Sequence, residues 1–98
     1  MRLTRTTRDV LDVFLADPDG ETYGLQLCQV TGLGPGTVYP ILSRLVQAGW
    51  LQSSWQDDHS GRGARRRLYR MTDKGRVEAH EALKAREAMF GARFGWAP

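Results

Sequence analysis

The sequence predicts a mainly α fold with a small β-hairpin, and three observations lead to this class. Apolar residues between Gly34 and Gly49 recur with the period of an α-helix. After Gly49 the pattern becomes that of two short extended segments around a polar, glycine-containing loop. From Asp73 onward the chain is alanine-rich and predicts one long helix. With 98 residues, 41% of them hydrophobic and 26% charged, the chain fits one globular domain with a modest core.

The helix predicted between Gly34 and Gly49, regular from about Pro35 to Ala48, is the element around which the chain is organised. One side carries Val38, Ile41, Leu42, Leu45 and Val46, and the other carries Thr37, Pro40, Ser43, Arg44 and Gln47. No acidic residue occurs from Thr22 to Gln56, so the polar side can approach base edges and phosphates without repulsion. Pro40 removes one helical hydrogen bond and should distort the first turn. Taken alone, this stretch favours a merely solvated polar side, and the DNA-binding interpretation depends on the segments around it.

The chain before this helix predicts a first helix and a turn. Its basic and polar beginning carries Arg2, Arg5 and Arg8. Thr7 is a candidate N-cap for a helix from about Arg8 to Ala16, which has a broad apolar face. Asp17-Pro-Asp-Gly ends this helix with turn residues, and the next three residues, 21–23, predict a very short extended segment.

A second short helix is predicted from Gly24 to Thr31, with Leu27, Cys28 and Val30 as inward candidates. Gly32-Leu-Gly-Pro supplies a tight turn into the central helix. Two helices joined by about four residues have the geometry of a helix-turn-helix, whose second helix enters the major groove of DNA.

The segments after Gly49 predict a β-hairpin with a basic returning strand. The strands are expected over Trp50–Trp55 and Arg65–Met71, around a loop over 57–64, with Leu68, Tyr69 and Met71 carrying the packing. Residues 57–76 include seven basic and three acidic side chains, a balance of +4. Such a run is usually a solvated face, but behind a helix-turn-helix it favours an arm on the phosphates or in the minor groove.

The last predicted helix begins with Thr72 as N-cap and runs to about Phe94. Leu83, Phe90 and Phe94 recur along it at spacings of seven and four, on one apolar stripe. So small a domain cannot cover the whole stripe, which favours a partner helix from a second copy; a helix folded back on its own domain is the alternative. We therefore expect a winged-helix DNA-binding domain over 1–75 and a dimerisation helix and tail over 76–98. Trp96 has no assignment from the pattern.

Several other classes of protein are disfavoured. The single cysteine, Cys28, excludes an intrachain disulfide, and His59 and His80 are too far apart to pair as metal ligands. There is no nucleophile beside a base, no paired carboxylates in an apolar setting and no phosphate-cradling glycine loop. No apolar run is long enough to span a bilayer. We expect a cytoplasmic protein that is not an enzyme and needs no cofactor or metal.

Four motifs together resemble those of the PadR family of winged-helix transcriptional regulators. They are Tyr23-Gly24, Gly36-Thr-Val-Tyr-Pro-Ile-Leu-Ser-Arg-Leu, Ala48-Gly-Trp-Leu and Arg67-Leu-Tyr-Arg-Met-Thr-Asp-Lys-Gly. The resemblance covers roughly residues 8 to 76. It is specific because the Gly-Thr-x-Tyr-Pro and Tyr-x-x-Thr-x-x-Gly elements occur in the right order and separation.

The resemblance implies a dimeric repressor whose recognition helix enters the major groove, whose hairpin wing touches the flanking backbone and whose C-terminal helix makes the dimer contact. Tyr39 and Pro40 match the family's Tyr-Pro pair, and Tyr39 is similar to a tyrosine that meets the DNA backbone. The single C-terminal helix resembles the short branch of the family. Some members bind flat aromatic ligands at the dimer interface, so the resemblance allows a planar aromatic effector near Trp96 or the last phenylalanines.

Residues and resemblance together predict a sequence-specific repressor that binds a palindromic operator in double-stranded DNA as a homodimer. The candidate DNA contacts are Thr37, Tyr39, Pro40, Ser43, Arg44 and Gln47 in the recognition helix and Arg62, Arg65, Arg66 and Arg67 in the wing. Arg44 is the candidate base reader, because a guanidinium can pair in bidentate fashion with guanine. Two alternatives stay open. An architectural or partition protein of a phage or plasmid would need the same contacts, and a winged-helix protein-interaction module would not need the arginine-rich wing.

Overall fold

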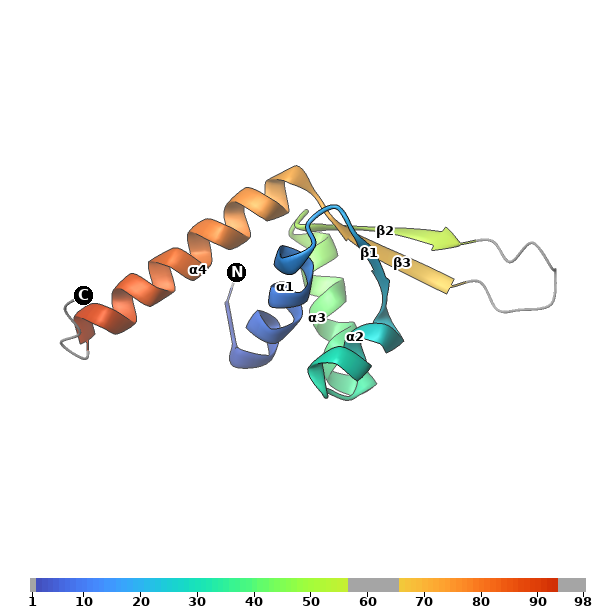
Figure 1. Ribbon diagram of the computed structural model, residues 1–98, viewed down its shortest axis with the longest axis horizontal. Helices are drawn as coiled ribbons and strands as arrows, with labels where there is room; N and C mark the ends of the chain where they lie inside the picture. Colours follow the sequence, from blue (N-terminus) through green and yellow to red (C-terminus); the bar gives the residue numbers. More distant parts are fainter. Residues whose placement is uncertain (1, 57–65, 94–98) are drawn as a thin grey trace.

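Four helices and a small sheet make up the part of the chain that the computed structural model describes, residues 2–56 and 66–93. The helices are α1 (Arg5–Ala16), α2 (Gly24–Thr31), α3 (Pro35–Gln47) and α4 (Asp73–Arg93), and the strands are β1 (Glu21–Tyr23), β2 (Leu51–Gln56) and β3 (Arg66–Met71). In Figure 1, α1, α2 and α3 form the central body, from which β2 and β3 extend in one direction and α4 in the other. This arrangement confirms the predicted class, a winged helix-turn-helix with a long C-terminal helix.

The hydrophobic core lies where α1, α2 and α3 meet one another and the sheet. Its buried residues are Leu3, Val10, Leu11, Phe14, Leu27, Val38, Ile41, Leu42, Leu45, Trp50, Leu51, Tyr69, Met71 and Ala79. Each buried Val, Leu or Ile side chain contributes about 1.5 to 3 kcal/mol to folding. The four from α3 lie on one side of that helix, so the core fixes α3 with its polar side outward.

Strand β1 makes the sheet three-stranded, whereas the sequence predicted a separate short segment and a two-stranded hairpin. The sheet is antiparallel with the order β1–β3–β2, and Tyr69 of β3 lies between Thr22 and Ser53. The described pairing of β2 with β3 runs from Leu51↔Met71 to Gln56↔Arg66 and lies over the two predicted strands. The predicted start of the second strand, Arg65, lies outside the described residues. Of the predicted packing residues, Tyr69 and Met71 are buried and Leu68 is partly buried.

Helix α1 begins at Arg5 and not at Arg8, so its predicted start and cap were wrong. The N-cap is Thr4, whose Oγ1 accepts a hydrogen bond from the Thr7 N–H at 3.3 Å. Thr7 lies inside the helix, is buried, and has its hydroxyl 2.9 Å from that of Thr4. Both threonines are chemically suitable caps. The burial of Leu3 in the core fixes where the chain enters the helix, and this contact could not be read from the pattern.

Helix α2 has the predicted bounds, but one predicted inward residue was wrong. Leu27 is fully buried and Cys28 is partly buried, whereas Val30 is 64% exposed. The covered side of this short helix runs through Gly24, Leu27 and Thr31, and Val30 falls beside it. Thr31 adds a hydrogen bond from its hydroxyl to the Leu27 carbonyl oxygen at 2.6 Å.

Thr72 connects α4 to the rest of the domain and is its N-cap, as predicted. Its Oγ1 donates to the carbonyl oxygen of Gly49 at 2.6 Å, lies 3.2 Å from that of Trp50, and accepts from the Gly75 N–H at 2.9 Å. Gly49 itself has φ +79°, which favours glycine and ends α3. One side chain therefore links the end of α3, the start of β2 and the first turn of α4.

The first part of α4 packs on the body of its own domain. Ala79 is fully buried there, and Ala82 and Leu83 are partly buried against the core. Farther along, Arg86 Nη1 donates a hydrogen bond to the Leu3 carbonyl oxygen at 3.2 Å. Met89 is 70% exposed. Part of the helix is thus left uncovered by this chain. Helix α4 is described as far as Arg93, and its predicted end at Phe94 lies outside the described residues.

Candidate nucleic-acid interface

The outward side of α3 brings together the residues predicted for the recognition helix. Thr37, Pro40, Ser43, Arg44 and Gln47 are all exposed, whereas Val38, Ile41, Leu42 and Leu45 are buried. Pro40 lies inside the helix, which nevertheless continues from Pro35 to Gln47. The exposed side chains end in hydroxyl, amide and guanidinium groups, which can bond to base edges and phosphates.

Two grooves flank α3. The wing-side groove, about 730 Å³, is lined by Tyr23, Gly24, Leu25, Gln26, Gln29, Tyr39, Trp55, Arg66, Arg67 and Tyr69. The α1-side groove, about 230 Å³, is lined by Arg2, Thr4, Thr7, Ile41 and Arg44. Each groove therefore contains one predicted recognition-helix residue, Tyr39 on the wing side and Arg44 on the α1 side, together with arginines from other elements.

In the wing-side groove, aromatic rings position the arginines of β3. The Arg66 guanidinium carbon lies 5.3 Å from the centre of the Tyr23 ring, and that of Arg67 lies 5.1 Å from the Trp55 ring. Such cation–π contacts hold a guanidinium without neutralising its charge. Tyr23 is fixed in turn, since its hydroxyl donates to Gln56 Oε1 at 2.5 Å. Both wing arginines are exposed, which suits contact with an anion.

Sequence reasoning missed the supporting residues Tyr23, Trp55 and Gln56. The cross-strand register places Trp55 opposite Arg67 and Gln56 opposite Arg66, so a correct register would have revealed these neighbours. It likewise missed Arg2, although the basic beginning of the chain was visible. No pattern in the sequence indicates that Leu3 packs in the core, and this packing places Arg2 next to α3.

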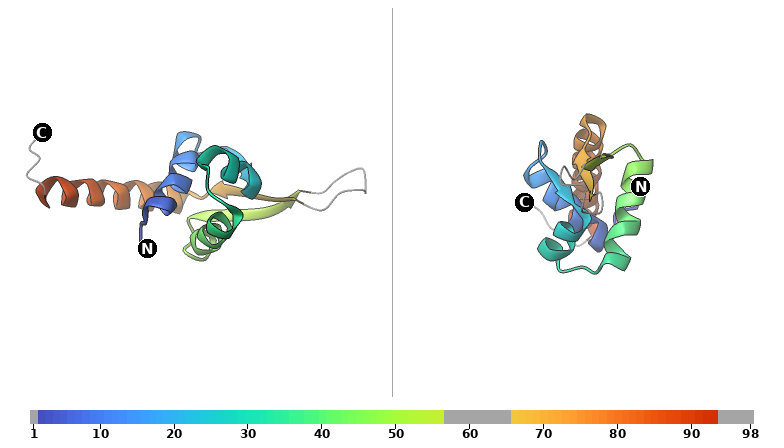
Figure 2. Two further views of the ribbon diagram at one scale, coloured as in Figure 1. Left: turned by 90° about the horizontal axis from the view of Figure 1, so that it is seen from below. Right: turned by 90° about the vertical axis from the view of Figure 1, so that its right-hand side faces the viewer.

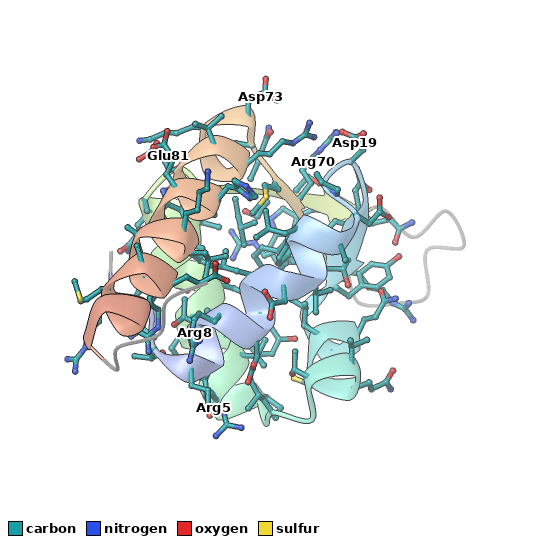
Figure 3. All side chains as sticks on the ribbon, turned by 60° about the vertical axis from the view of Figure 1, so that its left-hand side comes forward. Arg5, Arg8, Asp19, Arg70, Asp73 and Glu81 are labelled. Carbon is teal, nitrogen blue, oxygen red and sulfur yellow. The ribbon has the colours of Figure 1, made fainter. Side chains whose placement is uncertain are left out.

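The acidic residues of the described chain do not line either groove. Glu21 lies 3.9 Å from Arg70, and Asp19 lies 2.8 Å from Arg76 in ion pairs. Figure 3 shows Asp19, Arg70 and Asp73 at one end of the molecule, with Arg5 at the other. The surface around α3 is thus left with basic and neutral groups.

Some predicted site residues fall outside the described part of the chain. These are Arg62 and Arg65 of the wing, together with Phe94 and Trp96 near the end. The side chain of Phe90 is also outside it, although its backbone belongs to α4. Of the predicted dimer residues, Leu83 is described, and it packs partly against its own core. Within residues 2–56 and 66–93, no group of His, Cys, Asp and Glu is arranged to hold a metal, and no helix has the length and apolarity for a membrane span.

The chain has a helix-turn-helix, followed by two wing strands that carry arginines, and the outer side of α3 has no acidic residue. These features are those of a DNA-binding winged helix-turn-helix. The model of the transcriptional regulator PadR-like family matches residues 15–81. The chain belongs to this family, which places it among DNA-binding transcriptional regulators.

Solved structures with the same fold agree with this assignment. A PadR-like transcription factor from Bacteroides fragilis is 21% identical, with 95% of this chain and 93% of that one covered and a TM-score of 0.73. A PadR family regulator from Eggerthella lenta is 26% identical over 93% of this chain and 80% of that one, with a TM-score of 0.69. Bacillus subtilis PadR in complex with operator DNA is 21% identical, and the match covers 81% of this chain and 47% of that one, with a TM-score of 0.65. No curated protein sequence matches the chain.

Proposed function

We propose that the protein is a repressor that binds a specific operator sequence in double-stranded DNA. The observation that carries this proposal is the outward side of α3, where Thr37, Ser43, Arg44 and Gln47 are exposed and no acidic residue is interspersed. An α-helix fits the major groove, and these side chains then reach base edges. Arg44 is the base reader, since its guanidinium matches the two acceptors of guanine.

The wing supplies affinity. The guanidinium groups of Arg66 and Arg67 lie over aromatic rings in the wing-side groove and bind phosphates or enter the adjacent minor groove. Arg62 and Arg65, the other two wing arginines predicted from the sequence, are expected to act with them. Tyr39, on the α3 side of the same groove, contacts the backbone near the start of the helix. Phosphate contacts position the protein on the duplex but do not read its sequence.

The functional unit of this proposal is a homodimer joined by α4. Figure 1 shows α4 extending away from the body, and its own domain covers only its first part. Met89 is 70% exposed, and the predicted stripe continues through Phe90 and Phe94. A helix from a second copy would cover these side chains. We therefore assign residues 1–75 to DNA binding and 76–98 to dimerisation.

Binding to random-sequence duplex separates this function from that of a protein-interaction module. Fluorescence anisotropy of the intact chain with a labelled duplex should show binding whose affinity falls steeply as salt rises, because counterions are released from the phosphates. Absence of binding at low salt would refute DNA recognition.

Substitutions then test the division of labour between helix and wing. Arg44→Ala should weaken binding to the selected operator by about 1 to 3 kcal/mol and binding to random duplex only slightly. Changing Arg66 and Arg67 to alanine should weaken both, and should lower the salt slope by up to about one unit for each phosphate that the variant no longer binds. Arg76→Ala, which removes a charge paired with Asp19 away from α3, is the control. Equal losses on both duplexes from Arg44→Ala would contradict its role as a base reader.

A further inference from the structure

The beginning of the chain carries a basic side chain that the proposed function does not use. Leu3 is 8% exposed and belongs to the core, and its carbonyl oxygen accepts a hydrogen bond from Arg86 of α4. Thr4 caps α1. The backbone next to Arg2 is therefore anchored, and Arg2 is attached to a fixed point while its own side chain stays exposed.

This anchoring places Arg2 in the α1-side groove together with Arg44 of α3. The groove has a volume of about 230 Å³, and Ile41, 2% exposed, contributes an apolar wall. The Thr4 and Thr7 hydroxyls that complete the lining lie 2.9 Å apart and bond to each other. Arg2 and Arg44 are the charged residues in the lining.

The charge in this groove is uncompensated within the described chain. No acidic residue lines it, and neither the Arg2 nor the Arg44 side chain forms an ion pair or hydrogen bond with another described residue. Asp12, an acidic residue of α1, lines a different groove with Arg8, Leu83, Arg86 and Glu87. An anion that enters this groove therefore meets two basic residues and no carboxylate, so its binding is electrostatically favourable.

We propose that Arg2 binds a backbone phosphate of the DNA duplex beside Arg44, forming a third DNA contact on the side of α3 opposite the wing. A helix in the major groove has one phosphate backbone along each of its flanks. Arg66 and Arg67 line the groove on the Tyr39 flank, and Arg2 lines the groove on the Arg44 flank. In both views of Figure 2 the first turn of α1 lies on the same side of the molecule as α3. The inference rests on the proposed DNA binding and adds a contact to it.

The test is the salt dependence of duplex binding by the intact chain and by variants at positions 2 and 5. Arg2→Ala should lower the slope of log affinity against log salt by about one unit per protomer, and Arg2→Lys should retain most of it. The loss should be similar on the selected operator and on random duplex, since phosphates carry no sequence information. Arg5→Ala is the matched control, because it removes the same charge from a side chain that points outward from the start of α1 and does not line the groove (Figure 3). Thermal unfolding of all three variants should match that of the intact chain.

An unchanged slope in Arg2→Ala, with normal salt-dependent binding by the intact chain, would overturn this inference and leave the proposed function standing. An equal decrease in Arg5→Ala would also overturn it, since the effect would then be one of net charge. If the intact chain binds no duplex, the proposed function fails and this inference fails with it.

Discussion

The ring of Tyr39 in α3 lies directly against Gly24 at the start of α2. A Cβ atom built on Gly24 would stand 2.5 Å from Cε1 of the ring and 2.7 Å from its hydroxyl oxygen. Tyr39 is nevertheless 40% exposed. The absence of a side chain at Gly24 therefore gives the ring a defined place in the lining of the wing-side groove.

Gly24→Ala should displace this ring and weaken DNA binding to the same extent as Tyr39→Ala. Either variant should lose one hydrogen bond to a charged phosphate, which should weaken DNA binding by about 1.5 to 3 kcal/mol. The double variant should bind no more weakly than Tyr39→Ala alone, because both changes remove the same contact. Fully additive losses in duplex titrations would show that Gly24 acts independently of Tyr39.

Gly36, in the first turn of α3, has room for a side chain, in contrast to Gly24. A Cβ atom there would meet no atom within 4 Å, and its φ is not positive. Gly36→Ala should therefore stabilise the fold by up to about 1 kcal/mol through the helix propensity of alanine. If the duplex backbone approaches this turn closely, the same substitution weakens DNA binding. Chemical denaturation and anisotropy on one preparation measure both effects, and unchanged binding would place the backbone farther away.

The sequence predicted the elements of the fold well because most of them have strong local signals. Helical periodicity with Pro35 and Gly49 at the ends located α3. The features that were mispredicted depend on contacts between distant segments. The start of α1 depends on the packing of Leu3, and the pairing of β1 with β3 joins residues 21–23 to 68–70. Neither contact leaves a periodic pattern in the sequence.

The recognition face was predictable for the same reason, since the buried stripe of α3 determines which residues face outward. The grooves on its two flanks were not, because each is assembled from several elements. Tyr23, Trp55 and Arg67 come together only through the register of the sheet. The position of Arg2 next to Arg44 depends on the three-dimensional path of the first residues.

The junction around Thr72 should be the most sensitive point for stability outside the core. A Cβ atom on Gly75 would lie 2.1 Å from the Trp50 carbonyl oxygen, which is backbone and cannot move aside easily. Gly75→Ala should destabilise the protein by about 1 to 3 kcal/mol. Thr72→Val removes the cap bond to the Gly75 N–H and should cost about 0.5 to 2 kcal/mol. Urea denaturation measures both, and a Gly75→Ala variant as stable as the native chain would contradict this packing.

Dimerisation should depend on the part of α4 that its own domain leaves uncovered. Burying one large apolar side chain in the interface stabilises the dimer by roughly 1.5 to 3 kcal/mol. The loss of translational and rotational freedom on association opposes it by about 4 kcal/mol or more. Several side chains of the stripe must therefore be covered together. Changing Leu83 and Phe90 to aspartate should give a monomer that still binds duplex weakly. Sedimentation velocity distinguishes the species, and a dimeric Leu83/Phe90 double variant would show that the interface lies elsewhere.

Selection of bound sequences from a random duplex pool tests the central claim most directly. Two recognition helices related by a two-fold axis meet major grooves on one face of B-DNA about 34 Å, or about 10 base pairs, apart. The intact chain should enrich an inverted repeat with half-sites at that spacing, and the Arg44→Ala variant should lose the preference at one position of each half-site. A pool that remains random after repeated rounds, although the protein binds DNA, would contradict sequence-specific regulation and favour an architectural role.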